Sequence, residues 1–227
     1  MALDQFPPDL VPVRTADGSH TLDSRALKEH YHSLHGAAAE SRHVYIANGL
    51  LATGRQELRI LEIGLGTGLN VLLTWIECGR RGWKADYVAL EPFPLPERLW
   101  SALGHPAALG ALGRQNGYDA MMRARAGEQI LPGDGFTFRW ERGLVQHIRY
   151  VEELDLVYYD AFSPAVQPDM WTKAVFDGLC RAMRSGARLV TYCAKGSVRR
   201  AMMEAGLEVQ QLPGAPGKRQ MTGVQRQ

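Results

Sequence analysis

Short apolar runs alternate with segments of helical spacing along the chain from residue 58 onward. Strands are expected where four to seven consecutive residues are mostly apolar, and helices where apolar residues recur every three or four positions. The expected strands cover 58–63, 86–90, 136–140, 154–159, 187–193, 207–211 and 221–225, and the expected helices cover 69–78, 171–183 and 197–205, with further helical material before 125. This alternation predicts a mostly parallel sheet with helices on both faces.

The first 55 residues lack this alternation and are interpreted as an N-terminal extension that packs on a catalytic domain of residues 56–227. Within the extension, Asp17-Gly18 separates two short runs, 11–14 and 19–22. An Asp-Gly pair between such runs favours a tight hairpin turn.

The composition is that of an ordinary globular protein, because 45% of the 227 residues are hydrophobic and 22% are charged. Disordered, coiled-coil and collagen-like classes are therefore excluded. The most apolar stretch, 60–76, is interrupted by Glu62, Asn70 and three glycines and does not predict a membrane span. The first 13 residues have neither a basic start nor an apolar centre, which argues against a secretory signal. A cytoplasmic location is expected.

Charge is distributed unevenly, although the net charge is only +2. Residues 181–227 carry +7 and residues 1–180 carry −5. A basic C-terminal third indicates binding to a polyanion such as nucleic acid, although basic residues on solvated helix faces give the same pattern.

A glycine turn joins the strand at 58–63 to the helix at 69–78, and its residues Glu62-Ile63-Gly64-Leu65-Gly66-Thr67-Gly68 have the order acidic-x-G-x-G-x-G. Glycines at such a junction let the backbone approach a ligand at the helix N-terminus. The dinucleotide pattern G-x-G-x-x-G requires a glycine at position 69, which is Leu69. The turn therefore fits S-adenosylmethionine better than a dinucleotide, with Glu62 meeting the cationic end of the cofactor. Glu91 ends the next strand, where a carboxylate can accept hydrogen bonds from both ribose hydroxyls.

A second loop, Asp160-Ala161-Phe162-Ser163-Pro164, follows the strand at 154–159 and is expected beside the glycine turn. Enzymes that methylate nitrogen often have a polar-x-aromatic-x-proline loop at this position. An alkylamine has a pKa of about 10 by analogy with lysine, so it arrives protonated and unreactive. Asp160 is a candidate to orient the amine and take its proton, and Phe162 could stack on a base. Alternatively, Asp160 only caps the following turn.

These segments, together with several others, resemble one known family. The shared motifs are Gly18-Ser19-His20-Thr21-Leu22, His30-Tyr31-His32-Ser33 leading to Gly36-Ala37 and Glu40-Ser41, the glycine turn with Asn70, Asp160-Ala161-Phe162-Ser163-Pro164, Pro168-Asp169-Met170-Trp171, Val198-Arg199-Arg200, Ala205-Gly206 and Pro216-Gly217-Lys218-Arg219-Gln220-Met221. The family comprises the S-adenosylmethionine-dependent methyltransferases that complete 5-methylaminomethyl-(2-thio)uridine at the tRNA wobble position, either as the methyltransferase half of bifunctional MnmC or as free-standing MnmD. The glycine turn is common to many methyltransferases, whereas the combination with the other motifs is specific.

The resemblance implies a class I methyltransferase fold, which is Rossmann-like with a mostly parallel seven-stranded sheet. It implies methyl transfer to the primary amine of 5-aminomethyluridine, with Asp160 near the amine. The cofactor is S-adenosylmethionine, held by the glycine turn, Asn70 and Glu91. The partners are tRNA and the upstream enzymes that build the aminomethyl group on the same base. One departure concerns the adenine amino group, because Gly143 is followed by Leu144 rather than an acidic residue, which leaves that contact to Glu141 or to backbone.

The same resemblance suggests a set of substrate contacts. The expected residues are Tyr31, Ser33, Phe162, Ser163 and Trp171 around the amine, with Lys195, Arg200, Lys218 and Arg219 on tRNA phosphates. Trp171 is an equally good candidate for ordinary core packing. No metal is expected, because the spacing of His30, His32 and His35 does not place all three on one helical face. A methyltransferase for a small-molecule amine and a non-catalytic RNA-binding module are the alternatives.

Overall fold

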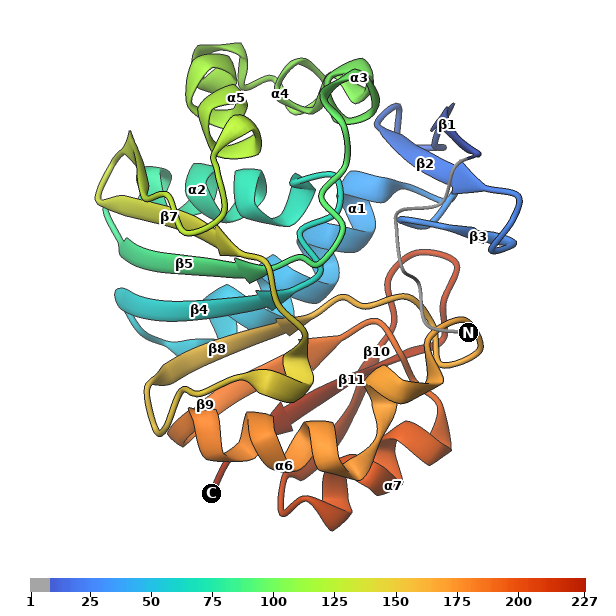
Figure 1. Cartoon of the computed structure of the whole chain (residues 1–227), viewed down its shortest axis with the longest axis vertical. Coiled ribbons are helices and arrows are strands. Elements are labelled where there is room, and N and C mark those ends of the chain that lie inside the picture. Colours follow the sequence, from blue (N-terminus) through green and yellow to red (C-terminus); the bar gives the residue numbers. More distant parts are fainter. Residues whose placement is uncertain (1–8) are drawn as a thin grey trace.

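A sheet of eight strands crosses the middle of the computed structural model, which describes residues 9–227 (Figure 1). The strands are β4 (Glu57–Ile63), β5 (Lys84–Leu90), β6 (Ile130–Gly133), β7 (Phe136–Glu141), β8 (Leu154–Tyr159), β9 (Met183–Thr191), β10 (Glu208–Pro213) and β11 (Gln220–Gln225). Their spatial order is β10-β11-β9-β8-β4-β5-β7-β6. The expectation of no secretory signal rests largely on residues 1–8, which lie outside the described residues.

The five strands β4, β5, β7, β8 and β9 pair in parallel, whereas β6, β10 and β11 pair in antiparallel fashion at the two edges. The mostly parallel sheet is thus confirmed, and β6 adds one strand to the seven that were expected. The sequence did not predict β6 because Pro132 and Gly133 weaken its strand pattern.

Helices cover both faces of this sheet. The α-helices are α1 (Ala37–Ser41), α2 (Leu69–Arg81), α3 (Glu97–Trp100), α4 (His105–Ala108), α5 (Gln115–Arg123), α6 (Lys173–Ala182) and α7 (Gly196–Glu204). A π-helix forms η1 (Arg42–Leu50), and short 3₁₀ helices form η2 (Leu51–Thr53), η3 (Ser101–Leu103), η4 (Leu112–Arg114), η5 (Val145–His147) and η6 (Pro168–Trp171). The helix expected at 171–183 is shorter than predicted, because Met183 already begins β9. Among the described helices none is long and apolar enough to cross a membrane.

Alternate side chains of the central strands enter two separate cores. Tyr158 points into the core that contains α2 and η1, and its neighbour Tyr159 points into the core that contains α6 and α7. This alternation is what a sheet buried on both faces requires.

The segment η1 is a π-helix of nine residues that packs on β8 and β9, and the sequence did not predict it. The packing is close at Gly49, where a Cβ would lie 3.0 Å from both Tyr158 Cε1 and Val190 Cγ2. A larger residue at position 49 would therefore require these two side chains to shift. Although η1 lies within the expected N-terminal extension, it covers the main sheet directly.

The predicted hairpin at Asp17-Gly18 is confirmed and belongs to a separate three-stranded sheet, made of β1 (Leu10–Arg14), β2 (His20–Ser24) and β3 (Glu29–His30). The Asp17 carboxylate accepts hydrogen bonds from Ser19 and from the Ala39 backbone N–H, the latter at 2.8 Å. Burial opposes its ionisation, but hydrogen bonds from Ser19 and Thr15 outweigh burial and hold the pKa of Asp17 at about 2. This carboxylate fastens the small sheet to the start of α1.

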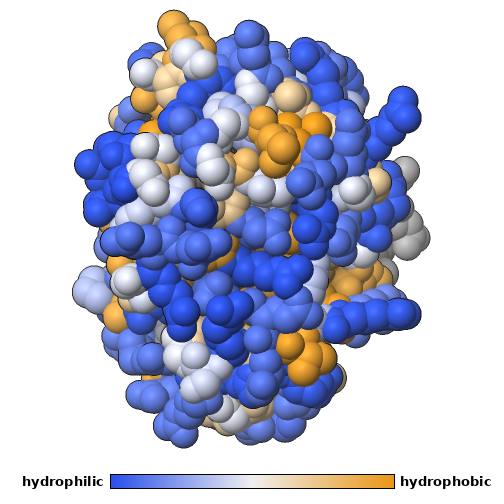
Figure 2. All heavy atoms as spheres, turned by 90° about the vertical axis from the view of Figure 1, so that its left-hand side faces the viewer, coloured by the Kyte–Doolittle hydropathy of each residue, from blue (hydrophilic) through white to orange (hydrophobic). Residues whose placement is uncertain are grey.

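Ion pairs occupy the amino ends of the parallel strands. Asp155 at the start of β8 lies 3.2 Å from Arg184 and 3.5 Å from Arg55, and Arg59 of β4 pairs with Glu153. Figure 2 views the molecule from this side and shows a surface that is largely hydrophilic, with scattered apolar groups. The cavity described next lies at the opposite edge of the sheet, where the strands end.

Candidate active site

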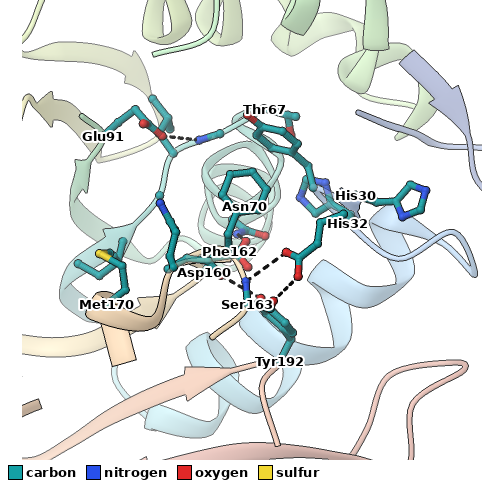
Figure 3. A pocket seen from close by; sticks show the side chains of 18 of the residues that line it. His30, His32, Thr67, Asn70, Glu91, Asp160, Phe162, Ser163, Met170 and Tyr192 are labelled. Carbon is teal, nitrogen blue, oxygen red and sulfur yellow. Dashed lines mark hydrogen bonds between the residues drawn. The ribbon is translucent and has the colours of Figure 1, made fainter. Parts of the chain in front are cut away.

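A cavity of about 790 Å³ opens at the carboxyl ends of β4, β5, β7 and β8. Loops 64–67, 91–93, 143–146 and 160–163 line one part of it, and residues 28–35 with Lys218 line another. Figure 3 shows Asp160, Asn70 and Phe162 in the middle of the pocket, with Thr67 and Glu91 on one side of them and Tyr192 on the other. This is the edge at which open α/β sheets bind ligands.

The glycine turn has the backbone conformation that its residues predict. Gly64, Gly66 and Gly68 have φ angles of 91°, 50° and 72°, which favour glycine because it has no Cβ. At Gly64 a Cβ would also lie 2.9 Å from the backbone oxygen of Asp160. The turn thus brings the start of α2 against the loop that follows β8.

Glu91 faces the glycine turn from the end of β5. Its carboxylate accepts the backbone N–H of Gly66 at 3.1 Å and that of Phe93 at 2.9 Å. Burial raises the pKa of Glu91, while these backbone hydrogen bonds oppose that rise. The carboxylate is therefore held in place on the pocket wall, with acceptor capacity left for a ligand.

Two buried polar atoms at the pocket have no hydrogen-bond partner among the described residues. They are the Thr67 hydroxyl and the Asn70 carbonyl oxygen Oδ1, and both residues line the cavity. Buried polar groups in native proteins are normally paired, so these two atoms indicate a polar ligand at this end of the pocket.

Asp160 ends β8 and has both carboxylate oxygens engaged. Tyr45 Oη donates to Oδ1 at 2.5 Å, and Asn70 Nδ2 donates to Oδ2 at 2.8 Å. Burial raises the pKa of Asp160 to about 7, against the lowering effect of the Tyr45 hydrogen bond. A carboxyl group with this pKa changes protonation state near neutrality, as a general base at neutral pH requires.

Sequence reasoning did not identify Tyr45. The residue lies in η1 and belongs to none of the motifs. It reaches Asp160 only because η1 packs on the sheet.

Glu62 lies behind the pocket and does not line it. It is fully buried, and its Oε1 accepts a hydrogen bond of 2.9 Å from Asn70 Nδ2. Burial raises its pKa well above the usual range. Glu62 was expected to meet the cofactor directly, but it reaches the cavity only through Asn70, which lies between them.

Aromatic side chains form the wall next to Asp160. The rings of Tyr31 and Phe162 are 5.0 Å apart in an edge-to-face arrangement, and both line the cavity. Trp171 is buried behind this wall, and its indole N–H donates to the Phe162 carbonyl at 2.9 Å. Trp171 therefore supports the loop rather than lining the cavity.

Ser33 and Ser163, two of the expected substrate contacts, line the cavity, and each hydrogen-bonds a glutamate to which the sequence analysis gave no role. Ser163 donates its hydroxyl hydrogen bond to Glu29, and the backbone N–H of Ser33 donates to Glu40 at 2.7 Å. Both glutamates also line the cavity. Motif reading gave them no role because their position depends on how residues 28–40 cross the pocket.

The basic residues of the C-terminal third divide into two groups. All four expected phosphate contacts are exposed, but only Lys218 among them lines the cavity, and Lys195, Arg200 and Arg219 do not. Gly143 also lines the cavity. Glu141, one of the two groups expected at the adenine amino group, does not line it and lies 3.2 Å from Arg139 in an ion pair. The backbone near Gly143 is the other expected group.

His30, His32 and His35 all line the cavity. In residues 9–227, no group of three or more His, Cys, Asp or Glu side chains could hold a metal ion. His32 is buried with its Nδ1 3.2 Å from the Thr21 hydroxyl, and burial lowers its pKa to about 4. It is therefore neutral at physiological pH.

Comparison with known proteins gives two kinds of sequence match. Residues 141–227 match a family described as S-adenosyl-L-methionine-dependent methyltransferase. Over 98% of the chain, the sequence is 34% identical to the tRNA 5-methylaminomethyl-2-thiouridine biosynthesis bifunctional protein MnmC of Ralstonia nicotianae, and over 93% it is 35% identical to that of Cupriavidus metallidurans. The chain spans about a third of the length of these curated relatives, 34% and 33% respectively.

The fold is similar to that of MNMC2 from Aquifex aeolicus, with a TM-score of 0.73 and 24% identity. That match covers 98% of this chain and 73% of the other. Spermidine synthase from Thermotoga maritima is a more distant match, with a TM-score of 0.52 and 7% identity over 95% of this chain and 71% of the other. The Rossmann-like methyltransferase fold expected from the sequence is thereby confirmed.

Proposed function

We propose that the chain is an S-adenosyl-L-methionine-dependent methyltransferase of the family that includes the MnmC proteins, and that it methylates the primary amine of 5-aminomethyl-(2-thio)uridine at the tRNA wobble position. The observation that carries this proposal is the position of Asp160. Its carboxylate lines the cavity at the end of β8, directly beside the glycine turn.

The pocket residues fit the family's cofactor. When bound, S-adenosylmethionine supplies an electrophilic methyl group. The glycine turn 64–68 would hold its amino-acid portion, and Glu91 would accept hydrogen bonds from its ribose hydroxyls. The unpartnered oxygen of Asn70 and the unpartnered hydroxyl of Thr67 supply the polar contacts that such a ligand satisfies. Backbone groups near Gly143 remain for the adenine amino group.

Asp160 would hold the substrate amine and take its proton. An alkylammonium with a pKa of about 10 must lose a proton before nitrogen can attack a methyl group. Asp160, with its pKa raised by burial to about 7, is a better proton acceptor than an ordinary aspartate. Tyr45 and Asn70 fix the carboxylate in one orientation, so the amine is aligned rather than merely neutralised.

The basic surface of the C-terminal third supports tRNA as the partner. Lys195, Arg200 and Arg219 are exposed and free of any ion pair with a described carboxylate. The proposal also places the protein in the cytoplasm, where it follows the enzymes that build the aminomethyl group on the same base.

The deciding experiment is mass analysis of wobble nucleosides after the protein and S-adenosylmethionine are incubated with aminomethyl-containing tRNA. We expect 5-aminomethyluridine to gain a single methyl group and to yield 5-methylaminomethyluridine. Methylation of free polyamines in place of tRNA would instead identify a small-molecule enzyme. No turnover with either, alongside retained RNA binding, would identify a binding module.

A further inference from the structure

Lys218 contacts the active-site pocket from the loop between β10 and β11, whereas Lys195, Arg200 and Arg219 do not line the pocket. Its ammonium lies 2.5 Å from Oε1 of the buried Glu40 and 4.5 Å from the centre of the Tyr192 ring. The carboxylate and the aromatic face thus hold the ammonium from two sides.

Glu40 is itself fixed. Its second oxygen accepts the backbone N–H of Ser33 at 2.7 Å, and only 8% of its side chain is exposed. Removing a buried carboxylate from water is costly unless it is paired, so the Lys218 ammonium stays beside it.

Hydrogen-bond capacity remains on Lys218. An ammonium has three N–H donors, and in the described part of the chain Glu40 occupies one of them. The Tyr192 face interacts with the positive charge without accepting a conventional hydrogen bond. Lys218 can therefore donate to an acceptor within the cavity.

The Lys218–Glu40 pair lies near the loop that carries Asp160, because the Tyr192 ring, 4.5 Å from the ammonium, belongs to a side chain whose hydroxyl donates to the Ala161 carbonyl at 2.9 Å. Burial is the main cause of the raised pKa of Asp160, and after burial the charge of Glu40 raises this pKa further while the charge of Lys218 lowers it. Both charges thus act on Asp160 across the cavity. A substrate whose amine lies at Asp160 presents its neighbouring atoms to Lys218.

In 5-aminomethyluridine, the ring carbon that carries the aminomethyl group is bonded to the carbon of the C4 carbonyl. With the amine at Asp160, O4 is the nearest acceptor of the ring. We infer that Lys218 donates a hydrogen bond to O4 and so selects uracil, with Glu40 as the residue that positions it. This inference rests on the proposed function and assigns Lys218 to the base rather than to a phosphate.

A matched pair of substrates tests this role. The two substrates are anticodon stem-loops that differ only at the wobble position, where one carries 5-aminomethyluridine and the other carries 5-aminomethylcytidine. The reacting amine is the same in both, but cytidine places an amino donor at C4. A donor opposite the ammonium leaves both groups unpaired, so we expect the wild-type protein to favour the uridine by about 10- to 100-fold in kcat/KM.

Three variants separate the possible roles of the lysine. In Lys218→Met the preference for uridine should fall to within about threefold, because no donor then distinguishes O4 from an amino group. The double variant Lys218→Met/Glu40→Gln should show the same loss of preference for uridine. It also leaves no unpaired buried carboxylate that could unfold the protein. Arg219→Met is the matched control and should keep the wild-type preference.

A preference for uridine that survives in the double variant would overturn the inference, as would a wild-type protein that methylates both stem-loops equally. A phosphate contact would show itself as a salt slope of tRNA binding that is smaller by about 1 in Lys218→Met, with the preference unchanged. If the wild-type protein methylates neither stem-loop, the proposed function fails as well.

Discussion

The hydroxyl of Tyr45 donates a 2.5 Å hydrogen bond to Oδ1 of Asp160, which joins the π-helix η1 to the end of β8. Tyr45 is almost completely buried, at 1% exposure. A buried hydroxyl that donates to a carboxylate stabilises the ionised form of that carboxylate. Tyr45 therefore helps to set the pH at which Asp160 can accept a proton.

Replacing Tyr45 with Phe should move the pH dependence of methylation upward. Asp160 must be ionised to take the proton of the amine, so wild-type kcat/KM is expected to rise as pH increases through about 7. Loss of the stabilising hydrogen bond raises the pKa of Asp160 further, and we expect the rise to shift by about one pH unit. The variant should approach wild-type activity at alkaline pH. An equal loss at every pH would mean that Tyr45 only supports the fold.

Replacing Asp160 with Asn should remove most of the turnover and leave cofactor binding nearly intact. Removal of a general base typically costs about 10²- to 10⁴-fold in rate. The amide has almost the same shape as the carboxylate, so the glycine turn beside it should not move. Single-turnover kinetics and calorimetric titration with S-adenosylmethionine measure the two quantities separately. A parallel loss of both would show that Asp160 maintains the pocket rather than the reaction.

Glu91 and Glu141 provide a matched comparison for the cofactor site. Glu91 lines the cavity and Glu141 does not. Charge-assisted hydrogen bonds contribute roughly 1.5–3 kcal/mol, so Glu91→Gln should weaken S-adenosylmethionine binding by about 10- to 100-fold. Glu141→Gln should leave the dissociation constant unchanged. The reverse result would restore Glu141 as the adenine contact expected from the sequence.

His105 should make the protein sensitive to mild acid. The residue is fully buried, and neither ring nitrogen has a hydrogen-bond partner among the described residues. Burial lowers its pKa to about 3, from 6.5 in an unfolded chain. The neutral ring therefore contributes stability above pH 6.5, and that stability is lost as the pH falls from 6.5 toward 3.

Between pH 6.5 and pH 5, protonation of His105 in the unfolded chain lowers the free energy of unfolding by about 2 kcal/mol. His105→Phe has no proton to bind, so its free energy of unfolding should fall less between pH 7 and pH 5 than that of the wild type. Urea denaturation at the two pH values gives the comparison. Identical decreases in the two proteins would show that His105 is not the acid-sensitive group.

The elements that the sequence predicted well are those with continuous apolar runs in the parallel sheet. The strand expected at 154–159 has those bounds in the structure. The Arg42–Leu50 segment was missed because its buried positions follow the wider winding of a π-helix, and because Asn48-Gly49 has the composition of a turn.

Some residues of the candidate site could likewise be predicted from local sequence pattern, and others could not. Asp160 and Glu91 could be predicted because each immediately follows a strand that ends at the cavity. Tyr45 and Glu40 could not, because their contacts with Asp160 and Lys218 depend on tertiary packing between segments more than 100 residues apart, at separations of 115 and 178. Local pattern carries no information about such pairs.

The attachment of the small β1–β3 sheet through Asp17 has a consequence for how this protein could be altered. Loops 64–67 and 91–93 of the main sheet form the wall proposed to hold the cofactor, whereas residues 28–35, delivered by β3 and the segment after it, form another part of the lining. Under the proposed function, part of the recognition of the molecule to be modified would thus be encoded apart from the glycine turn that holds the methyl donor. New acceptors could be sought by redesigning residues 28–35 together with Lys218, which lines the same cavity, while the glycine turn and the sheet are kept as they stand.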